Sequence, residues 1–448
     1  MRVILRFELL EMKQIYFLII VLSAGVLSGC GSSADRGEVI GVPARSFRAE
    51  VPYGMSYVPS GSFLMGQTDQ DVTFAQIAQT KQVTIPAFFM DQTEITNSQY
   101  HQFVNWVRDS IAIVNYLNDA KYYITPKGAA APAGGKKYIN WEYVRRNPIF
   151  AGARRGQPDN KQKLQAMYYQ GDDRVFDRDE IDVRSIKYNY SVMQLREAAN
   201  YKNDKTKKRS DFIKRDTVAI YPDTLVWLSD FSYAANEPMV EGYFSHPSFR
   251  DYPVVGVTWR QAKAFTVWRT RYNEAYKNSR RLPVRSGYDL PTEEEFEYAA
   301  RGGRIGTDYP WGGPYIKNAK GCLLANFKPG RGNYSDDGGT YTVKVRSYFP
   351  NDFNLYNMAG NVAEWTSSSY DASASTFVND LSPTFHYDAK DKDPEVMKRK
   401  VVRGGSWKDI GYFLQNSSRT YEYQDTAKSY IGFRCVTHFQ GRDLLDRQ

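Results

Sequence analysis

The chain has 448 residues, a net charge of +9 and four histidines. A chain of this length can bury one large core or two domains. The basic charge favours an acidic protein partner or an anionic surface, and it is equally consistent with solubility alone. The histidines are scattered without the spacing of a metal triad, which disfavours a zinc or non-haem iron enzyme. They are His101, His246, His386 and His438.

The N-terminal residues have the pattern of an export signal. Lys13 precedes an apolar run at 15–27, and Leu-Ser-Gly then leads into Cys30. A basic start, a short apolar run and small residues before the cleavage site are typical of a signal peptide. The run is shorter than the roughly 20 apolar residues that a membrane span requires. We therefore predict a signal peptide at 1–29.

The cysteine after this signal stands in the position of a bacterial lipobox. We expect Cys30 to carry the lipid and to begin the mature chain. Several acyl chains hold a protein on a membrane essentially permanently. The small and polar residues 30–50 are predicted to be a lipid-anchored tether. An exported lipoprotein does not meet nucleic acid, so no nucleic-acid partner is expected. The start codon, Met1 or Met12, stays open.

Short strands are predicted at the start of the folded part. Alternating apolar residues at 57–66 flank a Pro-Ser-Gly turn, which predicts a hairpin. Residues 83–95 predict two further strands that lead into a helix. From about 305 onward Gly, Asn, Asp and aromatic residues dominate, which predicts loops and short strands. The basic residues 202–215 are predicted to be a solvated helix face or loop.

Three helices are predicted from the same local signal, a capping box. The boxes are Thr96 with Gln99, Thr258 with Gln261, and Thr292 with Glu295. The acidic residues 293–295 suit the first turn of a helix, so we assign them to capping rather than to catalysis. Gly302 and Gly303 predict the end of that helix.

Four sequence blocks recur in the order of one known family. They are GSFLMG at 61–66 with MDQTEITNSQYHQFV at 90–104, PVVGVTWRQAKAFTVW at 253–268, LPTEEEFEYAARGG at 290–303, and LYNMAGNVAEWTSS at 355–368 with RGGSW at 403–407 and GFRC at 432–435. With these blocks the chain resembles the formylglycine-generating enzyme (sulfatase-modifying factor) family. The resemblance implies an α+β, loop-rich fold related to C-type lectins. It assigns 51–438 to one domain, with a large insertion at about 110–240 and a tail at 439–448.

The family fold brings two calcium sites, and both map onto this chain. Calcium prefers oxygens from carboxylates, amides and backbone carbonyls. The resemblance assigns the second site to Asn357, Gly360, Val362 and Glu364. It assigns the first site, on a loop shorter than the family's, to Asn326, Phe327, Asp337 and Gly339. The alternative is that these residues serve only turns.

The active enzymes of the family oxidise their substrate with a copper-binding cysteine pair. That pair would fall between Gly405 and Ser417, where this chain has no cysteine. Because a thiolate is the group that binds soft Cu(I), we predict a non-catalytic protein without copper. A disulfide cysteine of the family is replaced by Ala300, which leaves Cys435 without its family partner. A disulfide between Cys322 and Cys435 stays open.

Within the family, residues 58–96 and the lipobox resemble the GldK/PorK and GldJ lipoproteins of gliding motility and type IX secretion. This resemblance implies a ring component at the outer membrane, anchored by lipid on the periplasmic side. It also implies assembly with a GldN/PorN-type partner and with copies of itself. The large insertion is a natural place for such an interface.

Two other functions stay open. The first, the main alternative, is a calcium-dependent glycan- or peptidoglycan-binding module of lectin-like fold, with an aromatic loop at 366–400. An enzyme of another chemistry would use paired acids, either Asp336 with Asp337 or Asp391 with Asp393. No base signature lies near either pair, which disfavours this reading.

Overall fold

The computed structural model describes residues 50–66, 80–124, 137–150, 160–280, 282 and 286–441. The predicted signal peptide, Cys30 and nearly all of the tether lie outside the described residues, as does the tail from 442 onward. No described helix combines the length and the apolar composition that a membrane crossing requires.

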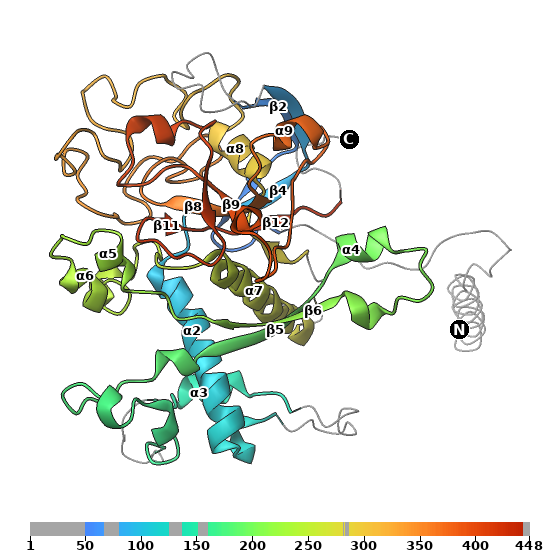
Figure 1. Cartoon of the computed structure of the whole chain (residues 1–448), viewed down its shortest axis with the longest axis vertical. Coiled ribbons are helices and arrows are strands. Elements are labelled where there is room, and N and C mark those ends of the chain that lie inside the picture. Colours follow the sequence, from blue (N-terminus) through green and yellow to red (C-terminus); the bar gives the residue numbers. More distant parts are fainter. Residues whose placement is uncertain are drawn as a thin grey trace, which may run out of the picture. The chain divides into compact units, whose positions relative to one another are not determined.

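Two four-stranded sheets form the centre of the folded part (Figure 1). The first has the order β1-β4-β12-β7 and is antiparallel. The second has the order β10-β9-β8-β11, in which β11 and β8 run parallel and the other pairs antiparallel. Their strands are β1 (Met55–Val58), β4 (Phe88–Asp91), β7 (Tyr288–Asp289), β8 (Ala363–Ser369), β9 (Arg399–Arg403), β10 (Thr420–Tyr423), β11 (Ile431–Gly432) and β12 (Val436–His438). Every residue of β8 is buried, so the second sheet carries polar side chains into the interior.

The other named strands form two hairpins. β2 (Gly61–Met65) pairs with β3 (Lys81–Ile85), and β5 (Lys187–Met193) pairs with β6 (Ile213–Ala219). The hairpin predicted at 57–66 is wrong in its pairing, although both strands exist. β1 pairs with β4 instead, because β4 is buried along its whole length and takes its place in the core beside β1.

The three predicted capping boxes are confirmed. The hydroxyls of Thr96, Thr258 and Thr292 accept from the backbone N–H groups three residues later. They begin α2 (Asn97–Ile111), α7 (Trp259–Ser279) and α8 (Glu293–Arg301). Gly302 ends α8 with a φ of +62°, a conformation that glycine adopts without strain.

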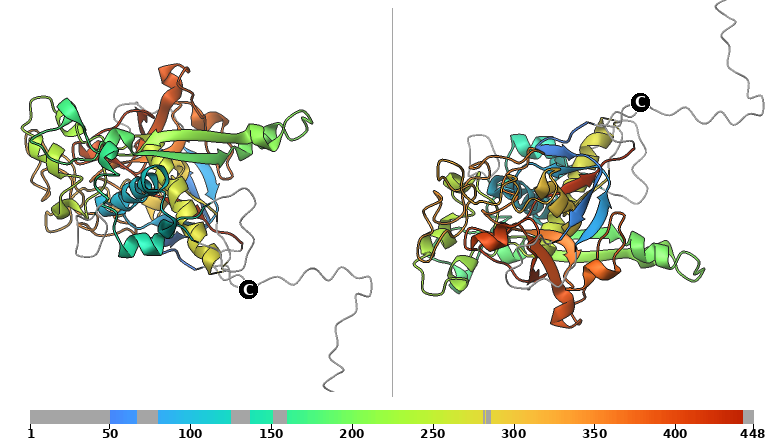
Figure 2. Two further views of the ribbon diagram at one scale, coloured as in Figure 1. Left: turned by 90° about the horizontal axis from the view of Figure 1, so that it is seen from below. Right: turned by 90° about the horizontal axis from the view of Figure 1, so that it is seen from above.

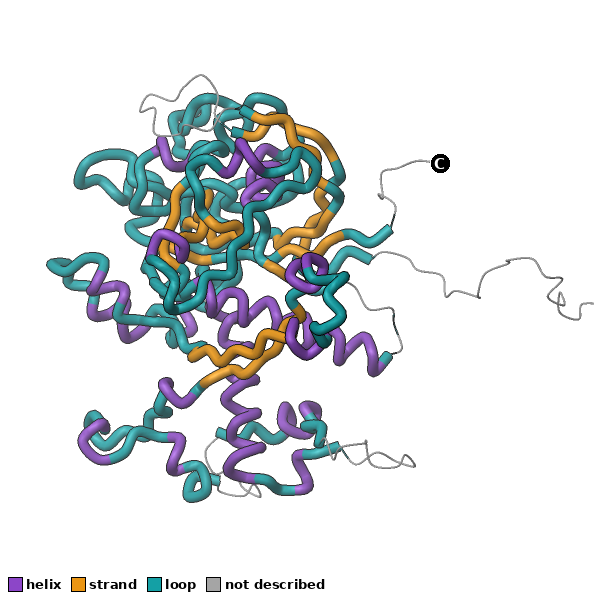
Figure 3. Tube along the Cα trace, turned by 45° about the vertical axis from the view of Figure 1, so that its right-hand side comes forward, coloured by secondary structure: helices purple, strands orange, loops and turns teal. Residues whose placement is uncertain are grey.

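The remaining helices are short. The α-helices are α3 (Trp141–Arg146), α4 (Leu195–Asn200), α5 (Val226–Ser229), α6 (Glu237–Gly242) and α9 (Ala374–Phe377), and η1 (Ala112–Leu117) is a π-helix. The 3-10 helices are η2 (Ala120–Tyr122), η3 (Gln165–Met167), η4 (Gly171–Asp173), η5 (Val183–Ser185), η6 (Arg209–Phe212), η7 (Pro247–Phe249), η8 (Glu395–Lys398) and η9 (Gly411–Leu414). Figure 3 shows how much of the chain runs as loop, which confirms an α+β, loop-rich fold.

The main core lies where α2 and α7 pack together beside the sheets. Tyr100 of α2 stacks on Phe265 of α7 with 5.7 Å between the ring centroids. The rings of Phe103 and Trp268 are tilted by 39° and lie 5.2 Å apart. Phe433, which follows β11, contacts both Tyr100 and Phe265. Burying each aromatic side chain stabilises the fold by about 2–3 kcal/mol, so this cluster ties the C-terminal strands to both helices.

Residues 112–219 add two features beside this core. The lobe, residues 112–186, has its own buried cluster around Ile113, Leu117 and Met167. The arm, residues 187–219, is the hairpin of β5 and β6 with α4 and η6 at its far end. Figure 1 and the left view of Figure 2 show the arm extending away from the sheets.

Candidate functional site

The segment after β9 is where the family's copper-binding cysteines are expected. The chain turns at Gly405, where a Cβ atom would lie 2.7 Å from the carbonyl oxygen of Phe413 and φ is +67°. Ser406 then closes a turn, because its hydroxyl donates to Oδ2 of Asp409 at 2.6 Å. η9 follows and buries Leu414 completely. The segment is therefore filled by a turn and an apolar side chain.

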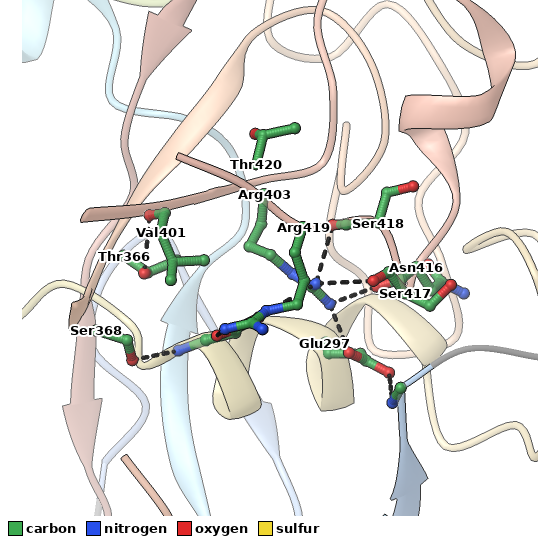
Figure 4. Close-up of polar contacts among 12 residues, drawn as sticks. Glu297, Thr366, Ser368, Val401, Arg403, Asn416, Ser417, Ser418, Arg419 and Thr420 are labelled. Atoms are coloured by element: carbon green, nitrogen blue, oxygen red, sulfur yellow. Dashed lines mark hydrogen bonds and ion pairs between the residues drawn. The ribbon is translucent and has the colours of Figure 1, made fainter. Parts of the chain in front are cut away.

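Arg403, the last residue of β9, lies buried beneath this segment (Figure 4). Its guanidinium donates to the carbonyl oxygens of Asn416 at 2.5 Å, Ser417 at 3.1 Å and Ser418 at 2.9 Å. It also donates to Oε2 of Glu297 in α8 at 2.5 Å. These bonds hold the end of the segment against α8.

Two further arginines complete this buried charge network. Arg419 pairs through both Nε and Nη2 with the carboxylate of Glu293. Arg301 donates to Oε1 of Glu297 at 2.7 Å. Burial alone would raise the pKa of Glu293, but Arg419 and Arg403 together hold that pKa below its usual value. The network is thus a set of paired ions inside the protein.

The capping role assigned to residues 293–295 applies to one of them. The carboxylate of Glu295 caps the backbone N–H of Thr292 at 2.8 Å. Glu293 instead pairs with arginine, and Glu294 is buried with its Oε2 unpartnered among the described residues. Burial raises the pKa of Glu294 to about 8. Capping was the only role that local sequence could suggest, because Arg403 and Arg419 lie more than 100 residues away.

The two side chains assigned to the second calcium site bind protein groups instead of pointing at one common position. Both carboxylate oxygens of Glu364 accept from the buried Arg434, at 2.6 and 2.7 Å. The amide of Asn357 donates to Glu94 at 3.1 Å. Gly360 and Val362 lie on the buried turn between them. Calcium at these residues stays a prediction.

Glu94 is a buried carboxyl that the sequence analysis missed. It accepts from the amides of Asn357 and of Asn361, the latter at 2.8 Å. Burial raises its pKa to about 8, against the lowering effect of Arg434. Glu94 stands two residues before a capping threonine, and such acidic residues are common in loops. The one signal was its place inside the MDQTEIT block.

The residues assigned to the first calcium site lie together. The carboxylate of Asp337 accepts from the backbone N–H groups of Phe327 at 2.6 Å and Gly339 at 3.0 Å. The amide of Asn326 donates to the carbonyl of Tyr341 at 2.8 Å. Its Oδ1 is buried and has no hydrogen-bond partner among the described residues. Burial raises the pKa of Asp337.

This first set fits a hard cation by its donor chemistry. Amide oxygens and carboxylates are ligands that calcium uses, and a buried oxygen without a hydrogen-bond partner is otherwise costly. No group of three or more His, Cys, Asp or Glu side chains among the described residues is arranged to hold a metal. Calcium at this set stays a prediction as well.

The two cysteines of the described chain are free. Cys322 is exposed and Cys435 is buried, so the disulfide that the sequence left open is not formed. The backbone N–H of Cys435 donates to Oδ2 of Asp91 at 3.0 Å. Burial raises the pKa of the Cys435 thiol, which keeps it protonated and unreactive.

A cavity of about 740 Å³ lies between the arm and α7, and no sequence motif pointed to it. Trp259, His386 and Asp388 are among its lining residues. Behind Trp259 lies Lys400, whose ammonium sits 4.3 Å from the ring centroid and donates to the carbonyl of Tyr387 at 2.6 Å. Burial lowers the pKa of Lys400 to about 8.

Known proteins resemble this chain over different lengths. Inactive C-alpha-formylglycine-generating enzyme 2 of Bos taurus is 33% identical over 193 residues, which cover 42% of this chain and 50% of that protein. Formylglycine-generating enzyme of Bos taurus is 26% identical over 400 residues, which cover 87% of this chain and 76% of that protein. The solved structure of PvdO from Pseudomonas aeruginosa matches with a TM-score of 0.43 and 17% identity, over 86% of this chain and 94% of that one.

The family model gives the broadest match. The sulfatase-modifying factor enzyme 1-like domain matches residues 42–439. This range includes the four sequence blocks, both sheets and the thiol-free segment after β9. Both formylglycine-generating enzymes and an inactive paralogue are among the relatives. The chain belongs to the sulfatase-modifying factor (formylglycine-generating enzyme) family.

Proposed function

We propose that this chain is a non-catalytic member of the family with a structural role. It acts as a GldK/PorK-type lipoprotein, held by lipid at the periplasmic side of the outer membrane. There it forms a ring of the type IX secretion and gliding-motility machinery with a GldN/PorN-type partner. The observation that carries the non-catalytic assignment is the segment after β9, which has no thiol and whose Leu414 is fully buried.

The packing of this segment argues against a replacement chemistry at the same place. Leu414 has no exposed surface, and Arg403 is committed to Glu297 and to three backbone carbonyls. Asp409 is held by Ser406. A copper-binding or oxidising site needs a thiolate that can reach its substrate, and these side chains offer no such group.

The secretion role draws its support from the lipobox and from the exposed arm. A relative of this chain is also named as inactive, which agrees with a family that retains its fold without turnover. Large assemblies bury apolar and aromatic surface between subunits. Exposed aromatic side chains in the lobe and arm include Tyr138, Phe176 and Tyr201.

One experiment tests both parts. The full chain is purified in detergent with its candidate partner, and the mass of the complex is measured. A large, defined oligomer is expected. The same sample is given copper, oxygen and a cysteine-containing sulfatase peptide, and no aldehyde is expected by mass spectrometry. A protein that stays monomeric would contradict the proposed ring assembly, and aldehyde formation would contradict the non-catalytic assignment.

A second candidate function is the calcium-dependent binding of glycan or peptidoglycan. The observation that favours it is the unpartnered Oδ1 of Asn326, the residue before Phe327, whose backbone N–H donates to Asp337. When bound, calcium would supply positive charge to these oxygens and to the carbonyls of Phe327 and Gly339. Retention on peptidoglycan that is lost with a chelator supports this function, and retention unaffected by the chelator rejects it.

A further inference from the structure

The base of the arm is anchored to the body. Tyr188 and Val218 are buried in the core cluster that includes α7. Arg271 of α7 donates to the carbonyl of Ser191 at 3.0 Å. Lys214 pairs with Asp388 at 2.6 Å. These contacts set the direction in which the rest of the arm leaves the body.

The distal arm, residues 195–212, is mostly exposed. Inside it, the rings of Tyr201 and Phe212 lie 6.5 Å apart. Residues 202–209 carry five basic side chains and one acidic side chain, a net charge of +4. Leu195 is 70% exposed. Ordering such a segment costs conformational entropy that its own burial does not offset, which favours a partner surface.

An acidic segment of opposite character lies in the lobe, at residues 172–184. It carries six acidic residues and three arginines, a net charge of −3. Arg184 braces it by pairing with both Asp173 and Asp182 at 2.8 Å. Phe176 projects from it and is 86% exposed. Aromatic side chains, Phe among them, are enriched at the centre of protein interfaces, and polar residues surround them at the rim.

The distal arm and the acidic segment lie on opposite sides of the folded part. In Figure 1 and in the left view of Figure 2 the arm extends to one side, and the green segment that leads into β5 lies on the other. One copy therefore does not pair its own arm with its own acidic segment. Two copies placed in sequence bring the positive arm of the first against the negative segment of the second.

We propose that the distal arm of one copy binds the acidic segment of the next copy. This inference rests on the proposed function, because it assigns the contact between copies in that ring. A contact between two different surfaces is heterologous, and repetition of such a contact closes into a ring or continues as a filament. Leu195 and Tyr201 supply the apolar contact for Phe176, and the opposite charges set the register and orientation.

Charge-swapped variants test this contact. The arm variant is Lys202→Glu with Lys205→Glu and Lys208→Glu, which changes the net charge of residues 202–209 from +4 to −2. The lobe variant is Asp172→Lys with Glu180→Lys, which changes the net charge of residues 172–184 from −3 to +1. The control is Lys317→Glu with Lys320→Glu, which reverses two exposed lysines elsewhere. Self-association of the full chain in detergent is followed by sedimentation, without any partner protein.

Each swap alone is expected to weaken self-association by about 100-fold, because like charges then face each other. The control is expected to assemble as the unchanged chain does. Mixing the arm and lobe variants restores assembly, since every acidic arm then meets a basic segment. If mixing does not restore the lost self-association, or if the swaps do not weaken self-association, the proposed contact is wrong.

The outcomes separate this contact from the proposed function. Assembly that follows the swaps, with no capture of a GldN/PorN-type partner, keeps the contact and rejects the secretion role. Capture of that partner in a ring that ignores the swaps keeps the secretion role and rejects the contact.

Discussion

The body of the molecule, which comprises the two four-stranded sheets with α2, α7 and α8, differs from the arm in where its charged side chains lie. In the body, Arg403 and Arg434 are buried, Arg419 is nearly so, and all three meet buried carboxylates. In the arm, five basic side chains at 202–209 stand in solvent. Buried ions depend on their partners for their stability, whereas exposed ions are screened by water and salt.

This difference predicts which property each region affects, folding or association between copies. A change to a buried ion in the body leaves its partner charged and unpaired, so it acts on folding. A change to an exposed charge of the distal arm leaves the fold almost untouched, so it acts on association. Unfolding and assembly measurements on matched variants therefore separate the two roles.

The largest effect is expected at the Glu364–Arg434 pair. Glu364→Gln removes the carboxylate that pairs with the buried guanidinium of Arg434, and we expect a loss of about 3–5 kcal/mol in the free energy of unfolding. Urea titration measures this loss. The matched control is Glu142→Gln in α3, which removes an exposed pair with Arg146 and changes stability by less than about 1 kcal/mol. Equal losses in both variants would contradict the comparison.

The pairing of Glu364 with Arg434 also shows where prediction from sequence ends. Helix starts are predictable, because Thr96 and Gln99 signal one within four residues. The family blocks predicted the α+β fold, and the calcium sites that they imply stay predictions. A local pattern does not show which carboxylate turns inward, since Glu94 meets Asn357 across 263 residues of sequence.

The strand pairing was mispredicted for the same reason. The link at 59–60 is a sound turn signal, but β3, the partner of β2, begins 16 residues after β2 ends, and β4, the partner of β1, begins 30 residues after β1 ends. The cavity beside α7 was not predictable, because it forms where the arm, α7 and residues 384–389 meet. Such features depend on tertiary packing, which a short stretch of sequence does not determine.

The next effect in size is that of calcium on the first predicted site. If Asn326 and Asp337 hold the ion, excess calcium at about 100 times its dissociation constant adds about 2.7 kcal/mol of stability. Adding a chelator is then expected to lower the melting temperature, which differential scanning calorimetry measures. Asp337→Asn abolishes the response to the chelator. An unchanged melting temperature with and without chelator would remove calcium from this site.

A smaller effect is expected from the buried carboxyl of Glu94. Its folded-state pKa of about 8 lies above the unfolded value, so the folded chain holds the extra proton. The stability from this proton is fully present below the unfolded pKa and is lost as pH rises toward 8. The slope is at most about 1.4 kcal/mol per pH unit. Glu94→Gln flattens the slope in urea titrations between these pH values, and an unchanged slope assigns the proton to another group.

The smallest effect on folding is expected in the arm. The triple variant Lys202→Glu, Lys205→Glu and Lys208→Glu changes only exposed side chains, so its unfolding free energy stays within about 0.5 kcal/mol of the unchanged chain. Urea titration in high salt, where the copies are apart, measures this value. A large loss of stability would place the arm among the parts that hold the fold together. A small change combined with a large loss of assembly assigns the arm's charge to the contact between copies, as the buried ions of the body are assigned to its fold.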